Sequence, residues 1–372
     1  MKFDSQSVLT GCILAAIGWL FSATISHSDR LAALEAKVDE RLASIDQSLS
    51  RVERNWTTIQ TRSNTRNGWP MANKPAKKRG SVEPTVERLS EKCISVSFTP
   101  IGAEWTVPVL LASDQHFDSA HADRKLIKKH LDEVVAANGR ALFLGDWFDS
   151  MQGASDRRGA KSALLPQYKR SDYLNALVED SVAFLEPYAP YIAGWAEGNH
   201  ETSILRHTEF DLLGATINEL NLRTGSEIQR MGYSGWVFLR YIQHSNSYIS
   251  DTKKIYFTHG SGGGGPVTKG VIATNRRATF LPDADIICSG HIHEAWSMEM
   301  RRERINSNGV TYAETQHHLQ LPTYKDEFAG DGSGWWHETG KAPRPMGGWF
   351  VDMTRHKVNN IWTYKATPRR AE

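Results

Sequence analysis

Cysteine is scarce in this sequence, with three residues, Cys12, Cys93 and Cys288, spread over 372 positions. An odd number of widely separated thiols excludes a disulfide framework and a cysteine-based zinc knuckle, and it favours a reducing compartment. Charge of either sign is also not in excess, because 44 basic and 42 acidic residues leave a net charge of +2. No global field therefore recruits nucleic acid, and the function has to come from local patterns.

Charge is absent altogether from Ser5 to Ser26, and residues 8–25 are mostly apolar. A bilayer span needs roughly 17–25 residues, so residues 1–29 are expected to hold a transmembrane helix of minimal length that acts as a membrane anchor. Lys and Arg are more numerous after this run than before it, which predicts a cytoplasmic catalytic domain by the positive-inside rule. A cleaved signal peptide is the alternative, although its charged start and cleavage site are weak.

Residues 30–60 carry apolar side chains at alternating steps of four and three, namely Val38, Leu42, Ile45, Leu49, Val52, Trp56 and Ile59. This spacing predicts a coiled coil, and hence a homo-oligomer formed through residues 38–59. A single amphipathic helix lying on the catalytic domain is the alternative. Residues 61–104 lose the periodicity and include the basic stretch "NKPAKKRGSVEP", which predicts a linker and lead-in.

From residue 105 to residue 372, short apolar runs alternate with segments of helical spacing. The runs that predict strands are "TVPVLLAS", "ALFLG", "YIAGWAEG", "KKIYFTHG" and "ADIICSG", and the helical segments are residues 123–138, 172–188 and 203–220. Such alternation predicts an α/β layer fold that binds ligands at the C-terminal ends of its strands. The chain from Val310 on is β-rich, and residues 150–190 contain an insertion.

Polar side chains follow the predicted strands at the points where the strands end. They are Asp114 and His116, Asp146 and Asp149, Asn199 and His200, His259, and finally His291 and His293. Each group alone is weak evidence, since a lone histidine is more often packed or exposed than a ligand. Five such groups in this order place nine ionisable or amide side chains at one edge of the sheets. Neutral imidazole is the commonest protein ligand for transition metals, so the pattern predicts a metal site.

The motifs D-x-H, G-D-x-x-D, G-N-H-E, H and G-H-x-H, in this order over residues 105–296, resemble the calcineurin-like metallophosphoesterase superfamily. The resemblance implies a β-sandwich flanked by helices in four layers, preceded here by an N-terminal helical extension. It implies two metal ions joined by Asp146, with His200 beside the scissile phosphate and oriented by Asp149. The further ligands that it implies are Asp114, His116 and His293 for one ion, and Asn199, His259 and His291 for the other.

Two metals about 3.5–4 Å apart can clamp phosphoryl oxygens and activate a bridging water for attack on phosphorus. A bridging carboxylate holds the two cations close, and His200 would assist by stabilising charge or protonating the leaving oxygen. The mixed nitrogen and oxygen ligands suit Mn best, and Fe, Zn or Ni as alternatives, better than Mg or Ca.

The expected substrate is a phosphodiester, with nucleic acid as the leading example. The basic residues Arg157, Arg158 and Lys161 in the insertion favour binding of substrate phosphates, although a solvated surface loop explains them equally. Asp149 is followed by Ser150 and not by the arginine of the Ser/Thr protein phosphatases, which disfavours that branch. The alternatives are a phosphomonoesterase acting on a small molecule and a membrane-tethered, non-catalytic assembly protein.

Overall fold

The computed structural model describes residues 82–150, 165–243, 247–263, 265, 267–326, 328 and 342–372. The chain divides between Ala72 and Asn73, and every described residue belongs to the second unit. The predicted transmembrane helix, coiled coil and homo-oligomer contact lie outside the described residues. Across the ranges that are described, no helix is both long and apolar enough to cross a bilayer.

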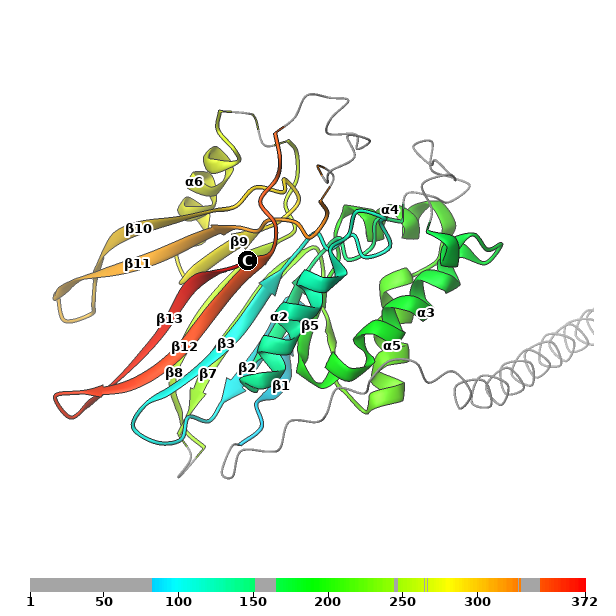
Figure 1. Ribbon diagram of the computed structural model, residues 1–372. Coiled ribbons are helices and arrows are strands. Elements are labelled where there is room, and N and C mark those ends of the chain that lie inside the picture. Colours follow the sequence, from blue (N-terminus) through cyan, green and yellow to red (C-terminus); the bar gives the residue numbers. More distant parts are fainter. Residues whose placement is uncertain are drawn as a thin grey trace, which may run out of the picture. The chain divides into compact units, whose positions relative to one another are not determined.

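Two β-sheets form the centre of the described unit (Figure 1). The seven-stranded sheet has the order β1 (Thr85–Ser90), β2 (Cys93–Phe98), β7 (Ser234–Ile242), β8 (Ile249–Thr258), β9 (Ile286–Ser289), β11 (Thr311–Gln320) and β10 (Trp296–Ile305). The six-stranded sheet has the order β13 (Ile361–Ala371), β12 (Gly348–Val358), β3 (Trp105–Ala112), β4 (Arg140–Leu144), β5 (Ile192–Ala196) and β6 (Gln229–Arg230).

Helices lie on the outer faces of the two sheets (Figure 1). The α-helices are α2 (Arg124–Ala136), α3 (Tyr173–Leu185), α4 (Asn199–Thr208), α5 (Leu212–Thr224) and α6 (Val271–Phe280), and the short 3₁₀ helices are η2 (Pro166–Tyr168) and η3 (Glu186–Tyr191). Side chains of α2, α3 and α5 share a core with the outer face of the six-stranded sheet. On the other sheet, Thr274 and Arg277 of α6 bond to His318 and Ser289. The predicted four-layer sandwich flanked by helices is confirmed.

The apolar runs of the sequence form strands that are buried on both faces. In β3, Val107, Val109 and Leu111 point into the core between the sheets, whereas Leu110 and Ala112 point into the core beneath the helices. Because successive side chains of a strand face opposite sides, a central strand between two cores has to be apolar throughout. The uninterrupted hydrophobicity of this strand thus reflects its place in the middle of the layers.

Two boundaries differ from the sequence prediction. Strands β1 and β2 lie inside residues 61–104, the range assigned to linker and lead-in, and β2 pairs in parallel with β7, so the sheet begins before residue 105. The helix predicted over residues 203–220 is two helices, because Glu209 adopts a left-handed conformation (φ 56°) that ends α4. Asp211 then caps α5 by accepting the Gly214 N–H. Helical periodicity continued across this break because both helices bury an apolar face.

Candidate metal centre

The five polar groups predicted from the sequence meet at one edge of the sandwich. Strands β3, β4 and β5 are parallel neighbours in one sheet, and β8 and β9 are parallel neighbours in the other. Their C-terminal ends therefore point the same way, as expected for a ligand site of an α/β fold. The two groups Asn199–His200 and Asp146–Asp149 occupy the first turn of α4 and the loop after β4.

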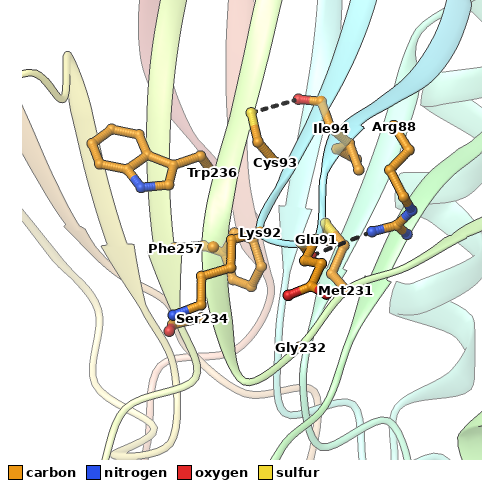
Figure 2. A pocket seen from close by; sticks show the side chains of 11 residues that line it. Arg88, Glu91, Lys92, Cys93, Ile94, Met231, Gly232, Ser234, Trp236 and Phe257 are labelled. Atoms are coloured by element: carbon orange, nitrogen blue, oxygen red, sulfur yellow. Dashed lines mark hydrogen bonds between the residues drawn. The ribbon is translucent and has the colours of Figure 1, made fainter.

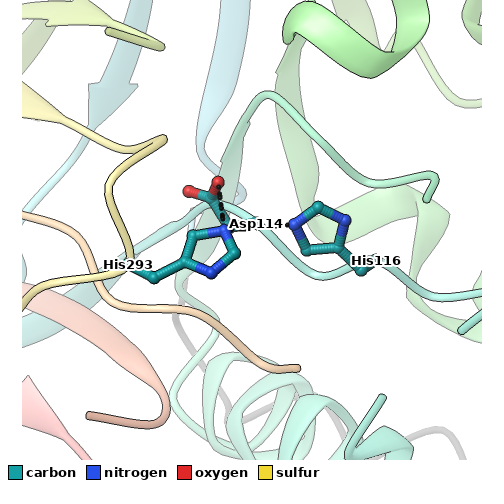
Figure 3. A group of neighbouring side chains, drawn as sticks. All are labelled: Asp114, His116 and His293. Carbon is teal, nitrogen blue, oxygen red and sulfur yellow. Dashed lines mark hydrogen bonds and ion pairs between the residues drawn. The ribbon is translucent and has the colours of Figure 1, made fainter. Parts of the chain in front are cut away.

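The first cluster of ligand atoms consists of Asp114, His116 and His293 (Figure 3). The Nε2 atom of His293 lies 3.1 Å from Asp114 Oδ1 and 3.2 Å from Nε2 of His116. Two imidazole nitrogens and a carboxylate oxygen that converge in this way form three sides of a coordination site for a cation.

The second cluster consists of Asp146, His259 and His291, whose ligand atoms lie within 4.8 Å of one another. The Asn199 Oδ1 atom lies 2.7 Å from His291 Nδ1 and 3.1 Å from His259 Nε2, and Asp146 Oδ2 lies 3.0 Å from the same His259 atom. The other ring nitrogen of His259 donates to the Leu144 carbonyl, which leaves its Nε2 atom for the cluster. These four residues are those that the resemblance assigned to the second metal.

Asp149 is placed differently from the prediction. Its carboxylate pairs with Nδ1 of His116 at 2.9 Å and with Nζ of Lys325 at 3.1 Å. His200 is held through its own Nδ1 by the backbone carbonyl of Asp149, not by the carboxylate. A carboxylate on the outer nitrogen of a ligating histidine sets the tautomer and ring orientation. The structure thus directs the Asp149 carboxylate to the first cluster, while the catalytic roles predicted for Asp149 and His200 stay predictions.

Backbone strain is concentrated on the predicted ligands. Five of them have positive φ angles: Asp114 (56°), His116 (45°), Asp146 (54°), His291 (73°) and His293 (54°). Such conformations cost about 1–3 kcal/mol each and persist where neighbouring groups impose them. Here the N–H of Asp114 donates to the Gly145 carbonyl at 2.9 Å, and that of His116 to the Asp146 carbonyl at 3.1 Å. Strain of this kind is typical of a functional site.

Two glycines let the strand exits approach one another. A Cβ atom at Gly198 would lie 2.0 Å from Oδ1 of Asp146, and one at Gly290 would lie 2.1 Å from the Ser113 hydroxyl and 2.6 Å from Asp114 Oδ2. All three distances are far below van der Waals contact. The glycines of G-N-H-E and G-H-x-H are therefore required by packing against the carboxylates of the site.

The buried carboxylates of the site favour the binding of cations. Burial by itself raises the pKa of Asp114, but the His293 and His259 imidazoles bring it down to about 2. Burial lowers the pKa of His259, and the carboxylates of Asp146 and Asp114 overcome this and raise it to about 10. In the described ranges, the ion pairs of the two buried carboxylates involve histidines alone. Divalent cations would supply the missing charge, and the nitrogen and oxygen donors fit them.

Four residues that the sequence reasoning did not select hold this site together. Glu201 accepts backbone N–H groups of both the β4 and the β5 exit loops, and Asp118 accepts those of Asp149 and Ser150. Thr323 Oγ1 donates to the Asp114 carbonyl at 2.8 Å, and Lys325 pairs with Asp149. Only Glu201 carried a signal, because a glutamate at the third position of a helix indicates a capping box.

The predicted substrate-binding residues Arg157, Arg158 and Lys161 lie outside the described residues. A small pocket does lie between the β1–β2 turn and the start of β7, lined in part by Arg88, Cys93, Met231, Trp236 and Phe257 (Figure 2). Its cavity volume is about 10 Å³, which is room for one water molecule. None of the predicted ligands lines it, so the pocket is not part of the metal centre.

Two facing sheets with carboxylate and imidazole clusters at their strand ends define a metal-binding protein of the sandwich type. The family model of calcineurin-like phosphoesterases matches residues 107–295, just over half of the chain, and the chain belongs to this family. Membership supports metal-dependent phosphoester hydrolysis as the general class of reaction. Among curated proteins, none matches the chain.

Solved structures of low sequence identity also align with the chain. Vacuolar Protein Sorting 29 from Cryptosporidium parvum is 12% identical, with 71% of this chain and 98% of that chain covered and a TM-score of 0.30. A conserved uncharacterized protein of Streptococcus pneumoniae, a predicted phosphoesterase, is 11% identical over 71% and 99%, with a TM-score of 0.25. GAP50 of Plasmodium, described as the anchor in the inner membrane complex, is 12% identical over 71% and 90%, with a TM-score of 0.31. With scores this low, none of the three supports an argument about activity.

Proposed function

We propose that this chain is a dinuclear-metal phosphoester hydrolase that prefers phosphodiesters. The observation that carries the proposal is that two clusters of ligand atoms with no residue in common, Asp114–His116–His293 and Asp146–His259–His291, lie at one edge of the sandwich. A third group, His116–Asp149–His200, shares His116 with the first. A structural metal site needs only one closed set of ligands. Two adjacent sets with mixed donors are typical of hydrolysis at phosphorus.

Asp114, His116 and His293 would hold one ion, Asn199, His259 and His291 the other, and Asp146 would join the two. When bound, two divalent ions, with Mn favoured over Fe, Zn or Ni, supply Lewis-acid stabilisation of phosphoryl oxygens and activation of water. Asp146 suits the joining position, because its Oδ1 is fixed by the His200 N–H at 3.0 Å and its Oδ2 faces His259.

His200 is the side chain best placed to act on the leaving group. Its Nδ1 atom contacts the Asp149 carbonyl, so its Nε2 atom is the one that can exchange a proton with a substrate oxygen. That atom lies 3.9 Å from Asp146 Oδ2, beside both clusters. His200 also belongs to the first turn of α4, where the helix dipole favours an anionic phosphate.

Two features support a diester substrate. The basic residues Arg157, Arg158 and Lys161 of the insertion offer charge for a phosphate next to the scissile one, as in nucleic acid. Ser150 is buried and donates its backbone N–H to Asp118. The position at which the Ser/Thr protein phosphatases carry an arginine is therefore a buried serine here, which disfavours a phosphoprotein substrate.

The test uses the full chain, stripped of metal and reloaded with Mn, on bis-p-nitrophenyl phosphate and p-nitrophenyl phosphate side by side. We expect Mn-dependent diesterase activity that falls by at least about a hundredfold in Asp146→Asn and in His200→Ala. The matched control is His207→Ala, an exposed histidine on the same helix, which should retain full activity. Metal analysis should give two ions per chain.

The other outcomes separate the alternatives. Monoesterase activity without diesterase activity would favour a phosphatase of small molecules. Two bound ions without hydrolysis of either substrate would favour the non-catalytic, membrane-tethered assembly protein. Hydrolysis that is unchanged in both Asp146→Asn and His200→Ala would contradict the assignment of this site.

A further inference from the structure

The hairpin of β12 and β13 projects beyond the sheet that it belongs to. Strand β3 pairs with β12 only as far as the Trp105–Arg355 pair, whereas β12 and β13 continue to pair up to Val358 and Ile361. Because β12 is antiparallel to β3, this free end lies beside the N-terminal end of β3. The metal centre follows the C-terminal end of the same strand, so the hairpin tip points away from it (Figure 1).

The tip is a tight turn with a defined shape. Two residues, Asn359 (φ 49°) and Asn360 (φ 66°), connect the strands, and both have positive φ. Two-residue hairpin turns with positive φ at both positions match the twist of the flanking strands, and asparagine is among the residues that favour them. The side chains next to the turn are therefore presented in a fixed arrangement.

These side chains are large, apolar and exposed. Val358 and Ile361 form the last cross-strand pair, and their exposed fractions are 47% and 70%. Trp362 follows with 40%. None of these three side chains belongs to a hydrophobic core of the described unit, and exposed apolar surfaces commonly mark a contact with a partner or a membrane.

The outer part of the same hairpin is basic and lacks acidic residues. Residues 353–371 contain five Lys or Arg and no Asp or Glu. The guanidinium of Arg355 lies 4.3 Å from the centre of the Trp362 ring, and Nζ of Lys357 lies 5.6 Å from it. Within the described part of the chain, Arg355, Lys357 and Lys365 form no ion pair with a carboxylate, so their charge is available to an anionic partner.

The neighbouring hairpin of β10 and β11 shows that this charge is not a general property of projecting ribbons. It also exposes apolar side chains near its turn, among them Ile305 and Val310. Its three arginines are balanced by three glutamates, however, and two of them, Arg302 and Arg304, lie 3.1 and 3.7 Å from the carboxylate of Glu314. A net positive charge beside an exposed apolar tip is thus found on the β12–β13 hairpin and not on the β10–β11 hairpin.

We propose that the tip of the β12–β13 hairpin docks on the surface of an anionic lipid bilayer. Val358, Ile361 and Trp362 would enter the interfacial region, and Arg355, Lys357 and Lys365 would face lipid phosphates and carboxylates. Tryptophan prefers the membrane interface, and each Lys or Arg near an anionic leaflet adds about 1 kcal/mol of attraction. Phosphates of nucleic acid would also attract the cations, but they offer no partner to the aliphatic tip. Docking in this way would turn the metal centre away from the bilayer.

The test follows amide hydrogen exchange of the hairpin in the full chain, with phosphatidylcholine vesicles that contain or lack phosphatidylserine. Local exchange reports the hairpin itself, so any other membrane-binding segment of the chain does not obscure the result. We expect protection of residues 355–365 by vesicles that contain phosphatidylserine, and weaker protection without it or at high salt.

Two pairs of matched variants make the test specific. Ile361→Ser should lower the ratio of protected to open hairpin about tenfold, whereas Leu222→Ser, at an equally exposed position (68%) on α5, should leave it unchanged. Lys357→Gln should lower the ratio about fivefold. Lys125→Gln, an exposed lysine on α2, should have no effect.

Three results would overturn the proposal. One is an unprotected hairpin in protein that is bound to vesicles containing phosphatidylserine. Another is protection by single-stranded DNA that equals or exceeds that by vesicles, which would assign the hairpin to nucleic acid. The third is protection that rises with protein concentration in the absence of lipid, which would assign it to a second copy of the chain. Hydrolase activity is not a readout here, so failure of the proposed reaction would leave this test valid.

Discussion

The carboxylate of Glu201 holds the backbone of Asp146 in place. Its Oε2 atom accepts the N–H groups of Asp146 at 3.1 Å and Gly198 at 2.8 Å, and its Oε1 atom accepts that of Phe148 at 3.0 Å. The loop after β4 is thereby tied to the first turn of α4, which carries Asn199 and His200. One buried side chain thus sets the separation of three predicted site residues without facing the clusters itself.

Replacement of Glu201 by Ala should damage metal binding more than the fold. Three buried N–H groups would lose their acceptor, at a combined cost of about 2–4 kcal/mol of unfolding free energy. Metal affinity should fall about 10–100-fold, because the orientation of Asp146 is lost. Denaturant unfolding and metal titration measure the two effects. Glu227→Ala, at an exposed glutamate, is the control, and an unchanged metal affinity in Glu201→Ala would contradict this role.

A methyl group at Gly198 should disrupt the second cluster. The added Cβ would lie 2.0 Å from Asp146 Oδ1 and 2.4 Å from the Asp146 backbone nitrogen, so the carboxylate has to move. We expect Gly198→Ala to lose one of two bound metals and to lower kcat/KM at least about tenfold. Gly263→Ala is the matched control, because its Cβ would meet nothing within 4 Å. Full occupancy of both metals in Gly198→Ala would refute the packing argument.

Lys325 should support the reaction through Asp149. It lies 3.1 Å from one carboxylate oxygen of Asp149 and 3.3 Å from the other, and it lowers the pKa of that buried carboxyl after burial has raised it. Lys325→Met should weaken the hold of Asp149 on His116 and lower kcat/KM about 10–100-fold. Lys325→Arg should retain part of the activity, and Lys125→Met should retain all of it. Wild-type kinetics in Lys325→Met would rule out this positioning role.

The free energy of unfolding should decrease as the pH falls, over a pH range that is set partly by His130. Burial holds the pKa of this histidine down at about 4, compared with about 6.5 in an unfolded chain. Between these values the unfolded chain binds a proton that the folded chain does not, so stability decreases as pH falls from 6.5 to 4. Burial lowers the pKa of His318 to about 4 as well, so the two histidines add to the same slope.

The variant that checks this slope is His130→Gln, which can keep the hydrogen bond to the Tyr324 hydroxyl. It should remove about 1–3 kcal/mol of the stability difference between pH 7 and pH 4.5. Denaturant unfolding at several pH values measures the difference. His207→Gln, at an exposed site, should leave the slope unchanged. A slope in His130→Gln that equals that of the parent chain would show that the acid sensitivity has another origin.

Much of the fold could be predicted because strands and motifs alternate along the chain. Runs such as "TVPVLLAS" are apolar at every position, which marks central strands between two cores. Strands β1, β2, β7 and β10 escaped prediction, because their apolar residues alternate with polar ones and resemble linkers locally. The two-residue strand β6 was missed as well. The break between α4 and α5 was missed because the apolar spacing continues across it, while the left-handed conformation of Glu209 ends one helix and Asp211 caps the next.

The sequence by itself determined which side chains come together, since each predicted group follows a strand and parallel strands end at a common edge. Only the tertiary structure decided which partner each side chain takes. Asp149 turned to His116 and Lys325, and Glu201 to the backbone of the neighbouring loop. The partners of these contacts lie 33, 176 and 55 positions apart in the sequence. Contacts of this range depend on loop conformations and packing, which no local pattern of residues encodes.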